Sequence, residues 1–458
     1  MSLIIEKLLK LLPKDIIFCF NESMDVYRRD YSHAHGEKPL VVLKPFKASH
    51  LSLILKVSRE YKVPLYVRGS GTGKTGGCIP LSEGIVVSME DFNKIIDIDF
   101  VNSVAVVEPG VITYDLQLAA VKKNLFFPPD PASLKMSTIG GNIAENAGGP
   151  RTLKYGVTSD YVLGLEGFFA NGEPFSFGGA IYKNVAGYNI NQLLVGSEGT
   201  LGIVTKAILK LIPNPTCRSF VWVAFQSIDD AIYSLGQLKL KGVTPSMAEL
   251  MDSVCLNAVK DMTGEDYLVS SAMFYMLYEV DGFSESFVER DATLIVDICK
   301  QSGSLFEEVY IGDECPFLER RRLVSLSLNK MAISKVSHDV VVPISTLKQF
   351  FKFIQSFNID EKIKVLAYGH LGDGNLHVNI LNLSMETVEW EKLSSNIEYK
   401  IMEKVIALKG SISGEHGIGC TKSDYMSLAF TQEEINIMKL IKDSFDPYQL
   451  LNPGKIFK

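Results

Sequence analysis

The chain has 458 residues, of which 47% are hydrophobic and 22% charged, and its formal net charge is −7. A single hydrophobic core rarely grows to this length, so we expect two or three domains. The negative charge excludes the basic surface that is typical of nucleic-acid-binding proteins. The apolar runs are too short for a membrane-spanning helix, which needs about 20 consecutive apolar residues.

The seven cysteines are scattered along the chain, and no two of them form a CxxC pair. An odd and scattered set argues against a disulfide framework and against a cysteine-ligated zinc or iron–sulfur site. We therefore expect a reducing compartment and place the protein in the cytoplasm, with peripheral contact to the inner membrane as an alternative.

The first element is expected at residues 3–12, where charges interrupt an apolar run every few positions and Pro13 follows. This pattern predicts a short amphipathic helix rather than a signal peptide. Packing on the body of the protein is favoured over docking on a membrane surface.

Residues 39–211 are rich in glycine, and short apolar runs alternate there with helical patterns. The predicted strands are 40–43, 65–67, 84–87 and 104–107, and the predicted helices are 50–61 and 113–124. This alternation predicts a layered α+β or α/β domain.

A second domain is expected after Ile212-Pro213-Asn214-Pro215, whose prolines mark a boundary. A strand is predicted at 220–225 and a helix at 228–241, and the alternation continues to a hairpin at 363–381. We expect a mostly antiparallel α/β domain here, followed from residue 432 by a helix and an ordered terminal segment.

The segment 68–77, Arg-Gly-Ser-Gly-Thr-Gly-Lys-Thr-Gly-Gly, follows a predicted strand. Glycines let successive N–H groups turn toward an anion, so the loop is predicted to bind phosphate, with a plain glycine-rich turn as the alternative. A P-loop is excluded because Arg68 occupies the position of its first glycine. The spacing of Gly71, Gly73 and Gly76 fits the dinucleotide fingerprint, but a strand follows where that motif needs a helix.

Three further glycine-rich or proline-rich clusters lie in the same predicted domain, at 127–133, 138–149 and 196–204. Each could be turn chemistry by itself. Four clusters in one domain are better explained by a long ligand that approaches the backbone at several points. A dinucleotide that lies extended across the domain is such a ligand.

The segment 368–377 reads Tyr-Gly-His-Leu-Gly-Asp-Gly-Asn-Leu-His. Asp-Gly between apolar runs is a strong hairpin signal. A two-residue turn at Asp373-Gly374 places His370 directly opposite His377, with Cβ atoms roughly 5 Å apart. Alternation along the strand puts Asn379 on the same face.

Two opposed imidazoles can share one divalent metal, and Glu415 offers a third ligand beside His416 in a glycine-rich turn. Two histidines and one carboxylate with open positions are typical of a catalytic metal site. The alternative is a surface hairpin with incidental histidines. It is weakened because three of the chain's seven histidines occur in these two motifs.

The chain closely resembles the FAD-dependent D-2-hydroxy-acid dehydrogenase family, which includes D-lactate dehydrogenase, the flavin subunit of glycolate oxidase and D-2-hydroxyglutarate dehydrogenase. The matching blocks lie in family order at 68–77, 127–166, 187–211, 369–377, 411–419 and 452–457. The resemblance implies an α+β fold: a two-part FAD-binding domain of the vanillyl-alcohol-oxidase (PCMH) type, then an α/β substrate-capping oxidase domain with a mostly antiparallel sheet. The expected division is 1–35 (helical segment), 36–214 (FAD binding), 215–425 (substrate and metal) and 426–458 (a segment returning to the FAD domain).

The resemblance also implies a set of FAD contacts along the glycine clusters: the first loop wraps the pyrophosphate, the middle cluster lines the flavin, and the last meets the adenine half. The implied residues are Arg68, Gly69, Ser70, Gly71, Thr72, Gly73, Lys74, Asp130, Thr138, Gly141, Asn142, Gly148, Glu198, Gly202, Val204 and Asn452. Covalently flavinylated relatives carry a histidine in the glycine loop. This chain has none there, so non-covalent FAD is expected.

In metal-containing members, the residues matching His370, His377 and Glu415 hold a zinc- or manganese-like ion; iron(II) shares these ligands. The residue matching His416 is the catalytic base and also contacts substrate. Other substrate contacts are expected from Asn379, Arg320 and Lys335, with Arg322 as the fallback for Arg320 and a solvated arginine face as the alternative. His338-Asp339 is given no role.

The implied reaction is oxidation of a 2-hydroxy acid such as lactate, glycolate or 2-hydroxyglutarate to the 2-oxo acid. A quinone, a cytochrome or an electron-transfer flavoprotein is the expected electron acceptor, and a homodimer is a default expectation. One alternative is the flavin subunit of a multi-subunit glycolate oxidase. Others are a non-redox FAD-dependent ether-lipid synthase and a non-enzymatic nucleotide-binding module.

Overall fold

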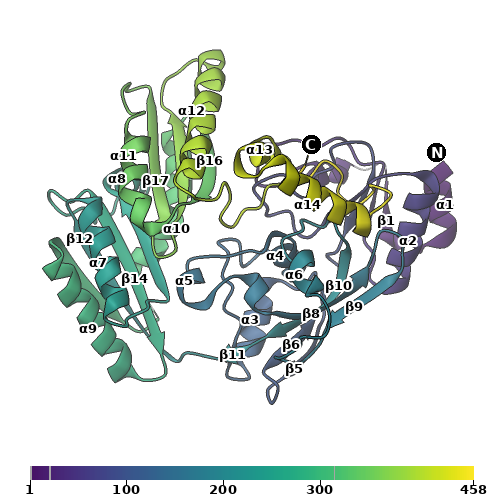
Figure 1. Ribbon diagram of the computed structural model, residues 1–458, viewed down its shortest axis with the longest axis horizontal. Helices are drawn as coiled ribbons and strands as arrows, with labels where there is room; N and C mark the ends of the chain where they lie inside the picture. The colour runs from purple at the N-terminus through teal and green to yellow at the C-terminus, as the bar shows by residue number, and fades with distance from the viewer. Residues whose placement is uncertain (1–2, 20–21, 314, 458) are drawn as a thin grey trace. The chain divides into compact units, whose positions relative to one another are not determined.

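The computed structural model describes residues 3–19, 22–313 and 315–457. The chain forms two compact units, each treated separately here. Unit 1 comprises residues 1–148, 157–214 and 415–458, and unit 2 comprises residues 149–156 and 215–414. Figure 1 shows the elements of both units under the labels used below.

Unit 1 is itself built in two parts, each around its own sheet. The first part holds a four-stranded sheet in the order β1-β2-β4-β3, in which β2, β4 and β3 are parallel and β1 is antiparallel. Apolar residues of two helices, among them Leu8, Leu51 and Ile54, pack on one face of this sheet. The elements of this part are α1 (Leu3–Leu11), η1 (Lys14–Ile16), β1 (Ile17–Phe18), η2 (Glu22–Arg28), β2 (Val41–Leu43), α2 (Ala48–Tyr61), β3 (Leu65–Arg68) and β4 (Ile85–Ser88).

The second part of unit 1 holds a five-stranded antiparallel sheet in the order β5-β6-β10-β8-β9, with a two-stranded ribbon of β11 and β7. Its strands are β5 (Ile95–Asp99), β6 (Val104–Val107), β7 (Leu125–Phe126), β8 (Val162–Phe168), β9 (Pro174–Gly178), β10 (Ile203–Lys210) and β11 (Ile212–Pro213). Its helices are α3 (Thr113–Val121), α4 (Ile139–Glu145), η3 (Thr158–Asp160) and α6 (Ile190–Leu194).

The C-terminal segment belongs to unit 1, although it follows unit 2 in sequence. It contains η5 (Ser423–Tyr425), α13 (Met426–Ala429) and α14 (Gln432–Phe445). After α14, Leu451 forms a parallel bridge with Leu65 at the start of β3. The buried ammonium of Lys442 donates hydrogen bonds to the carbonyls of Thr200 and Leu451, 2.7 and 3.0 Å away. These contacts fix the tail against the sheet that carries the first glycine loop.

Unit 2 is a seven-stranded, fully antiparallel sheet in the order β15-β12-β14-β13-β17-β18-β16. Its strands are β12 (Cys217–Phe225), β13 (Met247–Asp252), β14 (Phe274–Gly282), β15 (Ser304–Ile311), β16 (Ser334–Val341), β17 (Ile363–His370) and β18 (Asn375–Asn382). Its helices are α5 (Thr152–Tyr155), α7 (Ile228–Leu240), α8 (Ser253–Thr263), α9 (Glu285–Gln301), α10 (Pro316–Met331), η4 (Ile344–Thr346), α11 (Leu347–Gln355) and α12 (Thr387–Ala407).

Helices cover both faces of this sheet, so the inner strands β12, β13 and β14 are buried on both sides, whereas the edge strand β15 is partly exposed. On one face, α8 and α10 close a core in which Trp222 stacks on Phe317 with ring centroids 4.2 Å apart. Helices α7, α9, α11 and α12 pack on the other face, where Ser234 of α7 contacts the hydroxyl of Tyr278. Side chains alternate between these two faces along each strand, so residues two positions apart in a strand lie on the same face.

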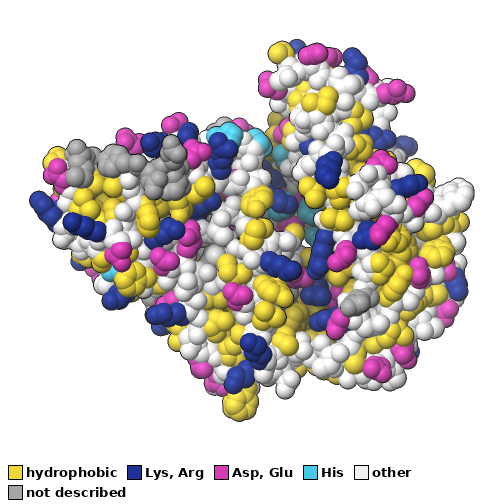
Figure 2. All heavy atoms as spheres, turned by 180° about the vertical axis from the view of Figure 1, so that it is seen from behind, with side chains coloured by type: hydrophobic (Ala, Val, Ile, Leu, Met, Phe, Trp, Pro, Cys, Tyr) yellow, Lys and Arg dark blue, Asp and Glu magenta, His cyan; other side chains and the backbone are white. Residues whose placement is uncertain are grey.

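The predicted α+β fold class is confirmed: unit 1 is built in two parts and unit 2 carries an antiparallel sheet. The N-terminal helix is confirmed at Leu3–Leu11, and the strand β4 follows the first glycine loop as predicted. Within the described ranges, no helix is both long and apolar enough to cross a membrane. Acidic and basic side chains are intermingled on the face shown in Figure 2, in keeping with the net charge of −7.

Candidate functional site

A row of polar side chains crosses four neighbouring strands of unit 2. The register pairs Glu249 of β13 with His370 of β17, Tyr368 with His377 of β18, and His377 with Asp339 of β16. Directly paired residues point to the same face of an antiparallel sheet. The polar row, as we call it, consists of Glu249, Tyr368, His370, Asn375, His377, Asn379, Ser337 and Asp339. It lies on the face covered by α8 and α10.

The predicted hairpin is present, but its predicted register is wrong. His370 pairs with Asn375 rather than His377, because residues 371–374 form a four-residue loop instead of a two-residue turn. Gly374 takes the left-handed φ of 83° in this loop, and the Asp373 carboxylate accepts the N–H of Asn375 at 3.0 Å. A shift by two residues keeps every side chain on its face. The two imidazoles are therefore diagonal neighbours, with ring centroids 5.2 Å apart.

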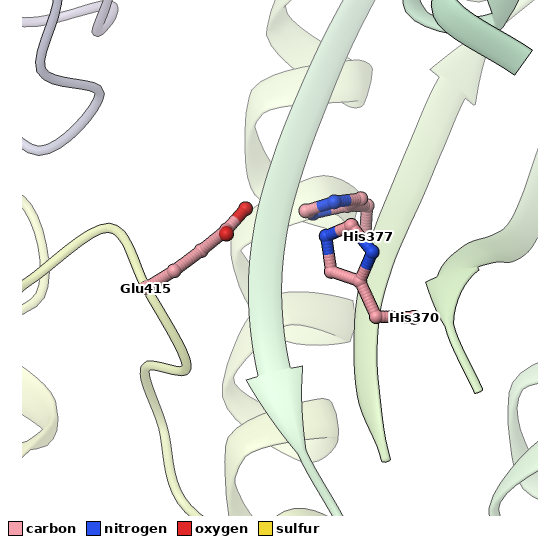
Figure 3. Close-up of side chains that lie close together, drawn as sticks. All are labelled: His370, His377 and Glu415. Carbon is pink, nitrogen blue, oxygen red and sulfur yellow. The ribbon is translucent and has the colours of Figure 1, made fainter. Parts of the chain in front are cut away.

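Glu415 joins these two histidines. One ligand atom from each of His370, His377 and Glu415 lies within 4.8 Å of the others. Figure 3 shows these three side chains close together. The backbone just before Glu415 is anchored because the N–H of Gly414 donates to Asp339 at 2.6 Å. A Cβ at Gly414 would overlap the side-chain amide of Asn375, so a larger residue there would displace that amide. Two imidazoles and one carboxylate at this separation form a donor set that suits zinc, manganese or iron(II).

His370 is oriented by a buried carboxylate. Its Nδ1 is hydrogen bonded to Oε1 of Glu249, whose other oxygen lies 2.6 Å from Nε of Arg321. Glu249 is fully buried. Burial by itself raises the pKa of Glu249, but the charges of Arg321 and His370 outweigh burial and hold that pKa below its usual value. The carboxylate is thus ionised at neutral pH and serves both partners.

The structure separates the two neighbouring arginines of α10. The Arg320 guanidinium pairs with Glu265 and lies over the ring of Tyr267, 5.1 Å from its centroid. The Arg321 guanidinium lies over Tyr368, 4.9 Å from the ring centroid, within the polar row. The structure therefore places the guanidinium of Arg321, and not that of Arg320, beside the polar row. The substrate role of either arginine stays a prediction.

The other predicted substrate contacts of unit 2 lie along the same face. Lys335 occupies that face of β16, and its ammonium donates to the hydroxyl and the carbonyl of Ser325, both at 3.3 Å. Asn379 accepts the Ser337 hydroxyl at 3.0 Å and donates to the His377 carbonyl at 2.9 Å. These bonds fix the amide of Asn379 in the polar row.

His416, the predicted base, follows Glu415 and lies in unit 1. Its Nε2 is 3.4 Å from a carboxylate oxygen of Glu415, and its carbonyl accepts the Thr75 hydroxyl at 2.9 Å. Thr75 belongs to the end of the first glycine loop. The backbone of His416 is therefore held by the loop that is predicted to bind the cofactor.

The first glycine loop of unit 1 packs too tightly for side chains at two positions. A Cβ at Gly69 would overlap the hydroxyl of Thr138, the N-cap of α4, and a Cβ at Gly71 would overlap the guanidinium of Arg68. Gly71 also has a left-handed φ of 74°. Arg68 itself donates to the Arg29 carbonyl at 2.7 Å, so it supports the loop from behind.

A cavity of about 520 Å³ opens beside this loop in unit 1. It is lined by Ser70, Glu90, Asn93, Ile95, Gly110, Val111, Ile112, Asp115 and Thr138. The Ser70 hydroxyl is buried and has no hydrogen-bond partner among the residues that the structure describes. A buried polar group of this kind indicates a missing partner. The loop and this hydroxyl together fit a phosphate-bearing cofactor.

Further predicted cofactor residues brace the loop from neighbouring segments. Asn452 accepts the N–H of Val67 at 2.9 Å and donates to the Glu198 carbonyl at 2.6 Å. The Glu198 carboxylate accepts the N–H groups of Ile418 and Gly419, both at 2.7 Å. Burial raises the pKa of Glu198, although these two N–H groups lower it.

The remaining predicted cofactor residues occupy three places in unit 1. Asn142 in α4 donates to the Thr113 hydroxyl at 2.8 Å. Gly202 and Val204 lie at the start of β10, where Val204 pairs with Gly167. The others are Thr72, Gly73 and Lys74 in the first loop, Asp130, which is buried, Gly141 in α4, and Gly148 at the end of the first segment of unit 1. Their contact with FAD stays a prediction.

Comparison with known proteins agrees with this geometry. Residues 39–178 match the family model described as FAD binding domain, and residues 214–456 match that of FAD linked oxidases, C-terminal domain. The chain belongs to the FAD-linked oxidase family. It is therefore a flavoenzyme of the oxidoreductase class, and the family resemblance inferred from the sequence is confirmed.

Two relatives and one solved structure illustrate the match. The chain is 40% identical to the glycolate oxidase subunit GlcD of Bacillus subtilis over 95% of this chain and 93% of that protein. It is 31% identical to the D-lactate dehydrogenase of Anaerostipes hadrus over 99% and 96% of the two chains. The structure of p-cresol methylhydroxylase with substrate bound superimposes with a TM-score of 0.80 at 17% identity, covering 99% and 96% of the chains, which supports the fold.

Sequence reasoning missed Glu249 and Arg321. Glu249 stands in an apolar strand, Met247–Asp252, where a buried carboxylate needs a charged partner. The position of Glu249 in an apolar strand was therefore a signal that the sequence itself offered. Its partners, His370 and Arg321, could not be named, because they depend on which strand and which helix lie beside β13.

Proposed function

We propose that this flavoenzyme oxidises a D-2-hydroxy acid of the lactate, glycolate or 2-hydroxyglutarate class to the 2-oxo acid. The observation that carries the proposal is the polar row of unit 2. Its two histidines form a metal-type donor set with Glu415, and the half-buried Arg321 of α10 and Lys335 of β16 lie on the same side of the sheet of this FAD-linked oxidase. The hydroxy-acid activities named for two close relatives support the same substrate class.

Non-covalent FAD is proposed to bind at the glycine loops of unit 1. FAD, when bound, supplies the two-electron acceptor, which takes a hydride from C2 of the acid. The protein's part is to hold the pyrophosphate with the N–H groups of residues 69–74 and with the Ser70 hydroxyl. Thr138, as N-cap, fixes the start of α4 against Gly69.

A divalent metal, zinc or manganese, is proposed to be held by His370, His377 and Glu415. Such an ion supplies Lewis acidity that lowers the pKa of a bound hydroxyl. The three side chains would fix the position of the ion. The hydrogen bond from the Gly414 N–H to Asp339 anchors the backbone next to Glu415. The donor set leaves coordination positions for the hydroxyl and one carboxylate oxygen of the acid.

Side chains near this donor set are proposed to bind the substrate carboxylate and to accept the substrate's hydroxyl proton. Arg321 can bind the substrate carboxylate bidentately through two N–H groups, a geometry that a lysine cannot reproduce. Lys335 adds a second positive charge. Asn379, fixed by Ser337, contacts the acid. His416 takes the hydroxyl proton on its imidazole, and the two electrons leave with the C2 hydrogen.

The test is anaerobic bleaching of the flavin absorbance by matched D- and L-2-hydroxy acids that differ in side-chain length. We expect one D-acid to bleach the flavin fastest while its L-enantiomer has little effect. Flavin that stays oxidised with every acid would contradict the proposal.

A second candidate function is the flavin subunit of a multi-subunit glycolate oxidase. The relative at 40% identity is named as such a subunit, which favours this candidate over the ether-lipid synthase and nucleotide-binding alternatives. Co-purification of a tagged, natively expressed chain with iron–sulfur proteins would support it. An isolated chain that reduces a quinone analogue at full rate would argue against it.

Several finer points are part of the same proposal. The acceptor is a quinone, a cytochrome or an electron-transfer flavoprotein, and the enzyme is placed in the cytoplasm as a homodimer, with peripheral contact to the inner membrane as the alternative. The four-part division at residues 35, 214 and 425 also stays a proposal. Light scattering of the purified protein and fractionation of the host cell test the assembly and the location.

A further inference from the structure

The carboxylate of Glu249 lies at the centre of unit 2 with two basic partners. It is fully buried in β13, between β14 and β17, and it faces the side covered by α8 and α10. Oε1 bonds to Nδ1 of His370, and Oε2 lies 2.6 Å from Nε of Arg321. An isolated buried charge is costly, and apolar residues of similar volume often serve a core as well or better. Its presence here calls for a reason beyond packing.

The register explains how one carboxylate reaches both partners. Glu249 and His370 are directly paired in the β13–β17 ladder, so their side chains leave the sheet together. Arg321 comes from α10, which covers the same face, and Tyr368 beneath its guanidinium limits where the guanidinium can lie. His370 and Arg321 therefore meet at the two oxygens of one rigid side chain.

We propose that Glu249 is a positioning residue that sets both the metal-facing nitrogen of His370 and the place of the Arg321 guanidinium. By binding Nδ1–H, Glu249 fixes the tautomer in which Nε2 is the unprotonated nitrogen. A carboxylate behind a ligating histidine is a common arrangement, and its loss typically lowers metal affinity 10–100-fold. The inference rests on the proposed function, because it assigns His370 as a ligand and Arg321 as a substrate contact.

The shared carboxylate also links two parts of the site. If Glu249 held only His370, its removal would weaken metal binding alone. Because it also orients Arg321, the same change must weaken binding of a 2-hydroxy acid through its carboxylate. A single substitution is therefore expected to alter two measurable affinities.

Glu279 provides a matched control. It is also fully buried and lies on the same face, in the neighbouring strand β14, where it pairs with Arg151 at 3.0 Å and accepts the Ser246 hydroxyl at 2.9 Å. Its partners belong neither to the donor trio nor to the proposed substrate contacts. Glu249→Gln and Glu279→Gln thus remove the same charge from similar surroundings.

The experiment measures zinc and manganese binding to the metal-depleted, flavin-loaded holoenzyme by titration calorimetry. In Glu249→Gln we expect a 10–100-fold loss of metal affinity, unchanged flavin content and a higher KM for D-lactate. Glu249→Asp keeps the charge on a side chain that is one methylene shorter. Its metal affinity is expected to lie between those of the wild type and Glu249→Gln. Glu279→Gln is expected to bind metal as the wild type does, even where both Gln variants unfold at lower temperature.

The possible results separate the inference from the function on which it rests. Wild-type metal affinity in Glu249→Gln, or an equal loss in Glu279→Gln, would overturn the inference alone. A wild-type enzyme that binds neither metal would overturn the proposed metal site as well.

A second measurement covers the case in which Glu249→Gln does not fold. Nitrogen-15 NMR of the histidine rings in the metal-depleted wild type, with the His370 signal assigned by its absence in His370→Asn, should show a protonated Nδ1 and an unprotonated Nε2. The opposite tautomer at His370 would contradict the proposal.

Discussion

The glycine loops of unit 1 and the polar row of unit 2 are built on opposite principles. In unit 1 the first loop offers backbone N–H groups. Gly69 and Gly71 lie close against the side chains of Thr138 and Arg68, and Gly71 also has a left-handed φ that favours glycine. In unit 2 the chemistry is carried by side chains that regular strands present at fixed spacing, with His370 and His377 as the central pair. The glycine loop is therefore sensitive to a substitution that adds a side chain, and the polar row is sensitive to a substitution that removes a charge.

This difference predicts distinct failures. A substitution in the loops should release the cofactor and leave the polar row intact. A substitution in the polar row or at the adjacent histidine should leave the flavin bound but unreactive. Loss of the cofactor and loss of flavin reactivity should therefore be separable by substitution.

The largest effect is expected for His416→Gln. A positioned general base contributes roughly 10²–10⁴-fold to a rate, so anaerobic flavin reduction by the best D-acid should slow by about that factor. The flavin spectrum and the metal content should equal those of the wild type, because glutamine keeps the backbone bond to Thr75. Reduction at the wild-type rate would remove His416 from the role of base.

The glycine loop is tested by Gly71→Ala, with Gly73→Ala in the same loop as its control. Gly71 has a φ of 74° and lies against Arg68, whereas the nearest protein atom to a Cβ at Gly73 is an Asp30 oxygen 3.7 Å away. A strained residue costs about 1–3 kcal/mol, so Gly71→Ala should purify with less flavin and a lower apoprotein Tm. The Tm of the Gly73→Ala apoprotein should stay near that of the wild type; an equal fall in both variants would contradict the steric argument.

The arginine assignment is tested by Arg321→Lys and Arg320→Lys in the same helix. A lysine keeps the charge but loses the two-pronged contact with a carboxylate. A charge-assisted hydrogen bond contributes about 1.5–3 kcal/mol, so KM for the acid should rise about tenfold or more in Arg321→Lys. Arg320, which pairs with Glu265, should tolerate the change. The reverse ranking would restore the assignment made from the sequence.

The smallest effect is on the pH dependence of stability through Glu279. Burial by itself raises the pKa of Glu279, but Arg151 and Ser246 hold that pKa below its usual value in the folded chain. The stabilisation is thus complete above the unfolded pKa, about 4.3, and is lost as the pH falls toward the folded pKa. The slope for one proton is at most about 1.4 kcal/mol per pH unit. Denaturant unfolding of Glu279→Gln between pH 3 and pH 6 should show a flatter dependence than the wild type, and an unchanged slope would contradict the pairing.

The sequence predicts this molecule best where the relevant information is local. The hairpin and its two histidines could be found because Asp373-Gly374 and the alternating strands lie within a few residues of one another. The register was missed because the loop closes with four residues, and only the local φ of Gly374 and the Asp373 hydrogen bond decide that length. The face was still correct, since a shift of two positions preserves it.

Non-local neighbours could not be predicted in the same way. Glu249 lies 121 positions before His370, and only the strand order of the sheet brings the two together. The choice between Arg320 and Arg321 depends on the rotation of α10 about its axis, which three consecutive arginines do not reveal. The residue patterns indicated the ligand trio and the glycine loops, and the resemblance to a family agreed with both, but neither pointed to the carboxylate that joins His370 to Arg321.

The central claim is that a D-2-hydroxy acid reduces the flavin, and that this reaction needs a divalent metal, which His370, His377 and Glu415 would hold. The most direct test mixes metal-depleted, flavin-loaded enzyme rapidly with its best D-acid under anaerobic conditions, before and after zinc or manganese is restored. We predict that the flavin stays oxidised without metal and is reduced when metal returns. Equal reduction rates in the two samples would contradict the claim.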